Sequence, residues 1–184
     1  MSTTTNNTNE FAADIAEIRR RAREHMEEGP VTQTYSLDRE KVVKLLNEAL
    51  ATELVCVLRY KRHHFMARGI NSESVAAEFL EHANEEQEHA DQIATRITQL
   101  NGEPDMNPEV LTKRSHSQYV EGKDLVDMIK EDLVAERIAI DSYKQMIQYV
   151  AEKDPTTRRM LEQILEKEEE HADDMANLLS NHAK

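Results

Sequence analysis

The sequence has few of the residues that shape cross-linked or irregular proteins. Of its 184 residues, one is cysteine, four are glycine, four are proline and none is tryptophan. A single cysteine, Cys56, excludes an internal disulfide framework and any Cys-x-x-Cys metal site. The scarcity of glycine and proline leaves few turn signals, so we expect few and long secondary-structure elements.

Long apolar runs are also missing. The sequence contains no stretch of the roughly 18 consecutive apolar residues that a membrane-spanning helix needs. Its first residues, Ser2 to Asn7, are polar and lack the charged and apolar regions of a signal peptide. We therefore expect a cytoplasmic protein with no membrane partner.

Basic residues are in the minority. The chain has 23 Lys and Arg against 36 Asp and Glu, a formal net charge of −13. Binding a nucleic-acid backbone needs clustered Lys and Arg, so the balance predicts no nucleic-acid partner. An apolar share of 39% beside 32% charged residues is typical of a helical protein with a narrow buried stripe. The length fits one domain with a single core.

Apolar residues recur at helical spacing in four long runs. Each run spans roughly 25 to 30 residues, or about 40 Å as a helix. Ser36 is expected to cap the first run and Gly69 to end it. Asp154 and Pro155 form a cap and first-position pair that starts the last run. The four runs lie at about 36–69, 72–100, 122–150 and 155–179.

The lengths of the links between these runs predict the topology. The links before the second and fourth runs are short, which forces two antiparallel hairpins. The connection at 101–122 can run the full bundle length, so the second and third helices can lie parallel. The predicted fold is all-α, a four-helix bundle with one long crossover over residues 36–184. Residues 1–35 are expected to form an extension, with a polar tail and a short helix at 11–28.

A repeated motif is the strongest functional signal. The pattern Glu-x-Glu-His-Ala-Asp occurs at 86–91 and again at 168–173, and each copy follows a Leu-x-x-Glu-x₆-Tyr segment, at 50–60 and 133–143. The two halves agree in the spacing from the first glutamate to the second, 33 and 32 residues. Chance gives roughly one Glu-x-x-His in such a chain, so a single match would carry no weight. Two matches at nearly equal spacing predict one composite site.

The side chains of this site would require cations. Burying a carboxylate without a counter-charge costs several kcal/mol, and nearby basic residues such as Arg59 are expected to project elsewhere. Two divalent cations would balance four carboxylates. Four carboxylates and two imidazoles, without a thiolate, favour iron or manganese. The six predicted ligands are Glu53, Glu86, His89, Glu136, Glu168 and His171.

Two tyrosines accompany the motif. Tyr60 and Tyr143 stand seven residues after Glu53 and Glu136 on the same helix faces. Their hydroxyls are predicted to hold a ligand carboxylate by a hydrogen bond, because partners of this kind orient metal ligands. Cys56 is expected to be a small core residue. Five further histidines lack a matched partner and are expected at the surface: His63, His64, His82, His116 and His182.

On these motifs the chain resembles the ferritin-like superfamily, and within it the bacterioferritins and the Dps-like proteins with a bacterioferritin-type site. The resemblance covers roughly Ser36 to Leu179. It implies an iron-storage and detoxification protein with ferroxidase activity, which oxidises Fe(II) with O₂ or H₂O₂ and sequesters ferric mineral in a homo-oligomeric cage. It also implies two iron ions per subunit, or manganese in their place. Each iron would bind one terminal glutamate and one histidine, from Glu53, Glu136, His89 and His171.

By the same resemblance Glu86 and Glu168 would bridge the two irons, and all six residues would be catalytic. Two departures from the family pattern matter. Bacterioferritins bind haem through a Met directly after the bridging Glu of the second helix, and Gln87 stands there in this chain, so we expect no haem of that type. The chain ends 13 residues after His171, which leaves no room for the fifth helix of larger cages. A dodecamer is therefore expected.

Two other functions remain open. One is a di-iron or di-manganese oxidoreductase without storage, such as a manganese catalase or a hydroxylase. A rubrerythrin does not fit, because its rubredoxin part needs two Cys-x-x-Cys pairs. The other is a DNA protector of the Dps kind, which the acidic balance disfavours and for which the Arg19 to Arg23 cluster would be the DNA contact.

Overall fold

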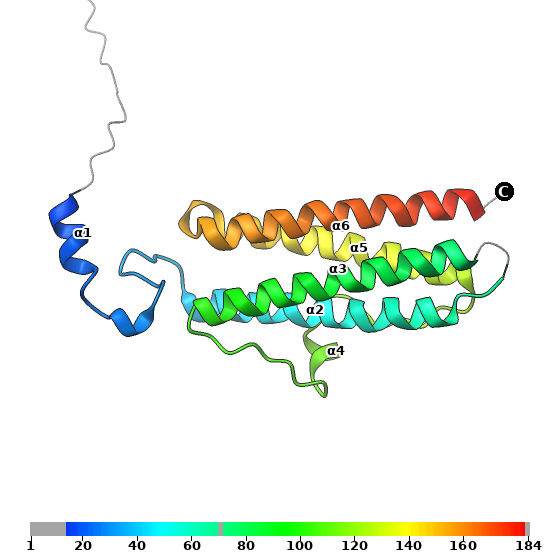
Figure 1. Cartoon of the computed structure of the whole chain (residues 1–184), viewed down its shortest axis with the longest axis horizontal. Coiled ribbons are helices and arrows are strands. Elements are labelled where there is room, and N and C mark those ends of the chain that lie inside the picture. The colour runs from blue at the N-terminus through cyan, green and yellow to red at the C-terminus, as the bar shows by residue number, and fades with distance from the viewer. Residues whose placement is uncertain (1–13, 70–71, 183–184) are drawn as a thin grey trace, which may run out of the picture.

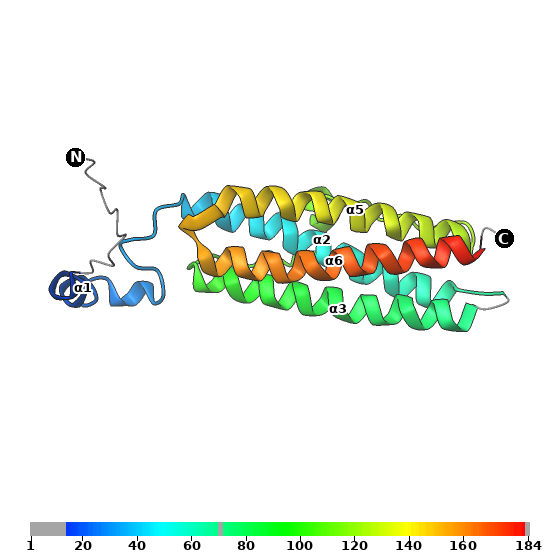
Figure 2. The same ribbon diagram turned by 90° about the horizontal axis from the view of Figure 1, so that it is seen from above.

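The chain folds into a bundle of four long helices. The computed structural model describes residues 14–69 and 72–182, and every regular element in these residues is a helix. The predicted all-α bundle is confirmed (Figure 1, Figure 2). None of the described helices is long and apolar enough to cross a membrane. The bundle helices are α2 (Arg39–Met66), α3 (Ser72–Gln99), α5 (Leu125–Val150) and α6 (Pro155–His182).

Aspartates begin three of these helices. The Asp38 carboxylate accepts a hydrogen bond from the Lys41 amide at 3.1 Å, so the expected cap Ser36 was two residues too early. Asp154 accepts from the Thr157 amide at 2.9 Å, and α6 begins at Pro155 as predicted. A side-chain acceptor at this position satisfies an amide that has no partner within the helix. Helix α2 ends at Met66, three residues before Gly69.

The long connection crosses the length of the bundle. Helix α2 is antiparallel to α3, and α5 to α6, whereas α3 and α5 run in the same direction (Figure 2). The crossover follows α2: Asn47 donates a hydrogen bond to the carbonyl of Glu103, and Arg62 to that of Glu121. A four-residue helix that the sequence did not predict, α4 (Leu111–Arg114), lies within it. Leu111 packs against α2.

The N-terminal helix is shorter than predicted. In place of one helix over 11–28, the described residues form α1 (Ile15–Arg21) and a 3₁₀ turn, η1 (Met26–Glu28). Residues 1–13 lie outside the described part. Helix α1 buries no residue, and a short helix without packing is marginal. The chain leaves the helix at Ala22, and His25 adopts a left-handed conformation with φ of 52°.

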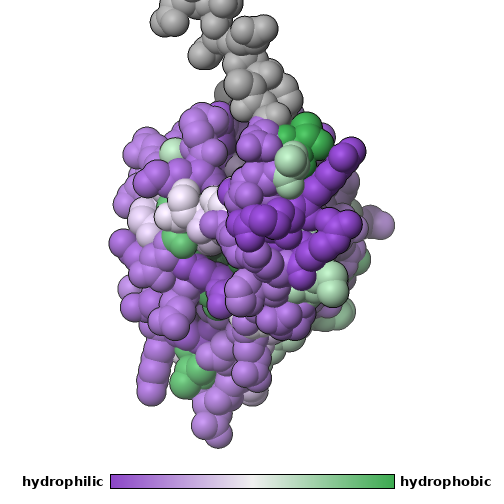
Figure 3. All heavy atoms as spheres, turned by 90° about the vertical axis from the view of Figure 1, so that its left-hand side faces the viewer, coloured by the Kyte–Doolittle hydropathy of each residue, from purple (hydrophilic) through white to green (hydrophobic). Residues whose placement is uncertain are grey.

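Two apolar clusters fill the bundle, one toward each end. The first gathers residues such as Leu46, Ile97 and Leu161, and the second gathers Phe79, Ile129 and Met175. Cys56 is buried in the second cluster, as expected. The end of the molecule that carries α1 presents mostly hydrophilic side chains (Figure 3). Between the clusters lies a layer of buried polar side chains.

A buried charge pair ties α2 to α5. Nε of Arg59 lies 2.8 Å from Oδ1 of Asp132, and Nδ1 of His63 lies 2.8 Å from Oδ2 of the same carboxylate. Arg59 also donates to Ser117 and to the carbonyl of Gln118 on the crossover. Arg59 therefore points away from the predicted site as expected, but it is buried, and the prediction that His63 lies at the surface was wrong.

Candidate metal centre

All six predicted ligands meet in the middle of the bundle. Each comes from the central part of its helix, and their exposed fractions range from 0% to 4%. The residues flanking them on each helix face are apolar, so folding of the bundle carries the six side chains into the interior. Helix α2 supplies Glu53, α3 supplies Glu86 and His89, α5 supplies Glu136, and α6 supplies Glu168 and His171.

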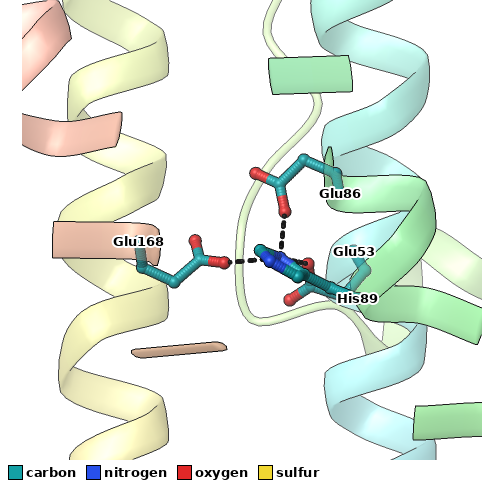
Figure 4. A group of neighbouring side chains, drawn as sticks. All are labelled: Glu53, Glu86, His89 and Glu168. Carbon is teal, nitrogen blue, oxygen red and sulfur yellow. Dashed lines mark hydrogen bonds and ion pairs between the residues drawn. The ribbon is translucent and has the colours of Figure 1, made fainter. Parts of the chain in front are cut away.

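The first half of the site is centred on His89 (Figure 4). Its Nδ1 lies 3.0 Å from an oxygen of Glu168, 3.3 Å from one of Glu86 and 3.4 Å from one of Glu53. Glu168 reaches across from α6, while His89 and Glu86 project from α3 and Glu53 from α2. Four ligand atoms from these residues lie within 4.8 Å of one another.

The second half is centred on His171. Its Nδ1 lies 3.7 Å from an oxygen of Glu86 and 3.9 Å from one of Glu136. Its other ring nitrogen, Nε2, lies 2.7 Å from an oxygen of Glu85. A carboxylate on the outer nitrogen fixes the orientation and tautomer of a metal-binding histidine. Glu86, Glu136, Glu168 and His171 again offer four atoms within 4.8 Å of one another.

Five atoms that point into this space form no hydrogen bond of good geometry, although two of them, Oε1 of Glu168 and Oε2 of Glu53, lie 3.0 and 3.4 Å from Nδ1 of His89. Among the described residues, buried side-chain nitrogen or oxygen atoms without a partner are rare, and most of them lie in this centre. Leaving a buried polar atom unpaired costs roughly 1–3 kcal/mol, and more when the group is charged. A divalent cation between these atoms would remove that cost. The atoms are Oε2 of Glu53, Oε1 of Glu86, Oε2 of Glu136, Oε1 of Glu168 and Nδ1 of His171.

The two tyrosines hold the outer glutamates. The Tyr60 hydroxyl donates to Oε1 of Glu136, and the Tyr143 hydroxyl donates to Oε1 of Glu53. Each tyrosine therefore holds a glutamate of the other hairpin. Both second oxygens, Oε2 of Glu53 and of Glu136, are left free to face the centre.

Burial and mutual repulsion shift the titration of the glutamates. Burial, followed by the charge of Glu86, raises the pKa of Glu53 to about 8 and the pKa of Glu136 to about 7. Burial and the neighbouring carboxylates also raise the pKa of Glu168 well above its ordinary value. Burial opposes a charge on His171, but Glu86 and Glu136 raise its pKa to about 9. Without cations, the centre therefore keeps protons that free side chains would release.

One buried residue beside the centre was missed. His82 is 2% exposed, and its ring stacks on that of His171 with centroids 4.0 Å apart. The prediction that it lies at the surface was therefore wrong. Its position four residues before Glu86 places it on the buried face of α3, so helical periodicity could have found it. Among the other histidines predicted at the surface, His116 is exposed as predicted, His64 is partly exposed, and the side chain of His182 lies outside the described part.

A surface hollow lies beside the centre. It has a volume of ≈ 520 Å³ between α3 and α6, and His89 is one of the residues that line it. Its lining is mostly acidic, with Glu85, Glu88, Glu166 and Glu170 against the single lysine Lys167. An acidic lining attracts cations from solution.

Comparison with known families agrees with this geometry. The family model described as the ferritin-like domain matches residues 43–184. The chain belongs to the ferritin-like domain family.

The chain is similar to three relatives over 71% to 80% of its length. The bacterioferritin of Desulfovibrio desulfuricans is 30% identical over 132 residues, 71% of this chain and 70% of its own. A solved structure of a bacterioferritin from that organism, reported with its diiron site, has a TM-score of 0.69 at 29% identity over 77% of this chain and 80% of its own. A nutrient stress-induced DNA-binding protein of a Nostoc species is 32% identical over 146 residues, 76% of this chain and 77% of its own. The dodecameric thioferritin of Bacteroides fragilis has a TM-score of 0.77 at 32% identity, over 80% of this chain and 89% of its own.

Proposed function

We propose that this protein stores and detoxifies iron by oxidising Fe(II) at the buried centre and holding the ferric product in a cage of subunits. The observation that carries the proposal is the set of unpaired ligand atoms in a dry interior. Four carboxylates face one another in this space, and two divalent ions would supply the four positive charges that balance them when they are ionised. The relation to bacterioferritins points to iron as the substrate.

Membership of the two ligand groups suggests the role of each residue. Glu86 and Glu168 belong to both groups, so they are the bridging pair. Glu53 and His89 occur only in the first group, so they complete the ligand set of one ion. Glu136 and His171 complete the other. Each ion then has three carboxylates and one imidazole, a donor set that suits iron and manganese.

The proposed reaction is a paired one-electron oxidation. Each Fe(II) loses one electron, and O₂ takes the two electrons with two protons to become H₂O₂. If H₂O₂ is the oxidant, it takes two electrons and two protons and yields two water molecules. Three carboxylates around each ion favour the higher charge of Fe(III), since Coulomb attraction is strong in a low-dielectric interior. The bridging pair holds the two ions close enough to supply both electrons together.

Kinetics of iron oxidation test the proposal. After anaerobic Fe(II) loading and mixing with oxygenated buffer, we expect a fast rise of ferric absorbance with the unmodified protein. Glu168→Ala removes a bridging ligand and should abolish the fast phase. Glu162→Ala changes an exposed glutamate of the same helix and should leave the rate unchanged. A fast phase that persists in Glu168→Ala would reject the site.

The oligomeric state of the protein distinguishes an iron-storage function from that of an oxidoreductase that stores no iron. We propose a dodecamer, the state named for the Bacteroides fragilis relative. Its native mass would be twelve times the 21.2 kDa of one chain, and it would stay soluble while taking up many irons per subunit. A small oligomer that binds two metals per chain and forms no mineral would instead favour the oxidoreductase alternative.

A DNA-protecting function is the weaker alternative, although one relative is named as a DNA-binding protein. Two of the four arginines in the basic cluster at 19–23 are paired with glutamates. Arg20 pairs with Glu17 and Glu24, and Arg21 lies 3.4 Å from Glu17. We expect no retardation of supercoiled DNA at physiological salt. Retardation that disappears when residues 1–28 are removed would revive this function.

A further inference from the structure

A second group of possible ligands lies one helical turn from the dinuclear centre. It consists of Glu78 and His82 on α3 and Asp174 on α6. His82 stands four residues before Glu86, and Asp174 stands three residues after His171. The group therefore lies next to the centre along the bundle axis, on the side of the α2–α3 turn. None of its members belongs to the six ligands proposed above.

The hydrogen bonds of His82 determine which of its nitrogen atoms is free. The Tyr60 hydroxyl gives its one proton to Glu136. Nδ1 of His82 lies 3.3 Å from the same hydroxyl oxygen, and that oxygen can only accept. We therefore assign the ring proton to Nδ1, and in the neutral ring of that tautomer the lone pair lies on Nε2.

Nε2 of His82 faces two carboxylates. It lies 3.5 Å from Oε1 of Glu78 and 3.7 Å from Oδ2 of Asp174. These separations are longer than a good hydrogen bond. They are close to the roughly 3 to 3.5 Å between two ligands that each lie about 2.1 Å from one ion. A lone pair facing two anions is repulsive, and a cation between the three groups would make it attractive.

The surroundings make this a partly enclosed site. His82 is 2% exposed and is held in place by its stacking on His171. The side chains of Glu78 and Asp174 are 33% and 40% exposed, so a hydrated ion can reach them from solution. Ligand atoms of Glu78 and Asp174 lie within 4.8 Å of each other, and burial, and then the charge of Asp174, raises the pKa of Glu78.

We propose that Glu78, His82 and Asp174 bind a third divalent cation, separate from the pair in the dinuclear centre. Two carboxylates and one imidazole, with water completing the shell, suit Fe(II), Mn(II), Co(II) or Zn(II). The inference goes beyond the proposed function, because it concerns binding and needs no oxidation step.

Counting tightly bound Co(II) ions under anaerobic conditions tests the site. Co(II) is a redox-stable probe whose visible absorbance reports coordination. We expect three tight ions per chain in the unmodified protein and two in Glu78→Gln/Asp174→Asn, whose changed side chains keep their size and are partly exposed. The matched control, Glu81→Gln/Asp173→Asn, alters exposed carboxylates on the same two helices and should still bind three. His82→Phe keeps an aromatic ring against His171 and should also bind two.

The possible outcomes separate this proposal from the dinuclear one. Equal numbers of tight ions in the unmodified protein and in Glu78→Gln/Asp174→Asn would overturn the third site. Loss of one tight ion in Glu81→Gln/Asp173→Asn as well would also overturn the third site, because removing other carboxylates from the surface would then have the same effect on Co(II) binding. One ion in the unmodified protein and none in Glu78→Gln/Asp174→Asn would support the third site and reject the dinuclear centre.

Discussion

The hydroxyl of Tyr143 on α5 donates a hydrogen bond to Glu53 on α2, and so joins the two hairpins of the bundle inside the metal centre. Tyr60 on α2 makes the equivalent bond in the other direction, to Glu136 on α5. Each bond occupies one oxygen of its glutamate and leaves the other aimed at the centre. The repeated Glu-x₆-Tyr segment therefore has a structural meaning. The tyrosine of one half positions the outer ligand of the other half.

This relationship predicts a specific defect in Tyr143→Phe. Loss of the hydroxyl leaves Glu53 free to rotate away, so the affinity for the cation pair should fall roughly tenfold, within the usual range for such partners. Anaerobic Co(II) titration measures this affinity. Tyr149→Phe changes a tyrosine that lies outside the centre, beside Lys41, and should leave the affinity unchanged. Equal affinities in the two variants would show that the hydrogen bond does not position Glu53.

The buried pair of Arg59 and Asp132 predicts a large effect on stability. Asp132→Ala leaves the Arg59 guanidinium buried without its counter-charge, which should lower the free energy of unfolding by about 3–5 kcal/mol. Urea denaturation of the metal-free protein measures the change. Glu121→Ala removes an ion pair in which Glu121 is 68% exposed, and should cost less than about 1 kcal/mol. A loss in Asp132→Ala as small as that of the control would contradict this account of the crossover.

The raised pKa values predict that the metal-free protein loses stability as the pH rises. Glu53 has a pKa of about 8 when folded, against an ordinary value of 4.5, so the folded chain holds a proton that the unfolded chain releases. The stabilisation of the folded chain by this proton is complete below pH 4.5 and is lost as the pH rises through 8. The raised pKa of His171, about 9, acts in the same direction.

Thermal unfolding in the presence of a chelator checks this pH dependence. We expect the melting temperature to fall by at least about 5 °C between pH 6 and pH 9, since titration of Glu53 between pH 6 and its pKa of about 8 costs about 2–3 kcal/mol, and each kcal/mol corresponds to roughly 2–4 °C in a chain of this size. The double variant Glu53→Gln/Glu136→Gln cannot titrate at these positions and should show a flatter profile. A melting temperature that rises over the same range would contradict the proton balance described for the centre.

Cation binding should stabilise the fold. Because the dinuclear site exists only in the folded chain, ions that bind it shift unfolding by mass action, by about 2.7 kcal/mol at one hundred times the dissociation constant. Differential scanning calorimetry with excess Co(II) should therefore show a higher melting temperature for the unmodified protein. In Glu168→Ala the increase should be much smaller. An equal increase in both would place the stabilising ions elsewhere.

The sequence predicted the bundle and the meeting of the six side chains, because both depend on local periodicity. The spacing of Leu, Ile and Glu on each helix decides which face is buried, and the duplicated motif brings the carboxylates to the same level. The starts of the helices were predicted less accurately. Asp38 rather than Ser36 caps α2, because several polar residues near a helix start can accept the same amide.

The buried polar residues outside the motif were not predictable in the same way. Arg59 and His63 are buried because Asp132, from a distant helix, and Ser117 and Gln118, from the crossover, happen to reach them. No periodicity within α2 encodes these partners. A charged residue is rarely buried unless it is paired. The partners of Arg59 and His63 come from segments whose positions the sequence pattern does not predict.

The most direct test is anomalous diffraction at the iron edge from a crystal soaked anaerobically in ferrous salt. The account predicts two peaks roughly 3.5–4 Å apart, one among Glu53, Glu86, His89 and Glu168 and the other among Glu86, Glu136, Glu168 and His171. Absence of density between these side chains, or a single ion held by surface carboxylates alone, would contradict the proposed centre.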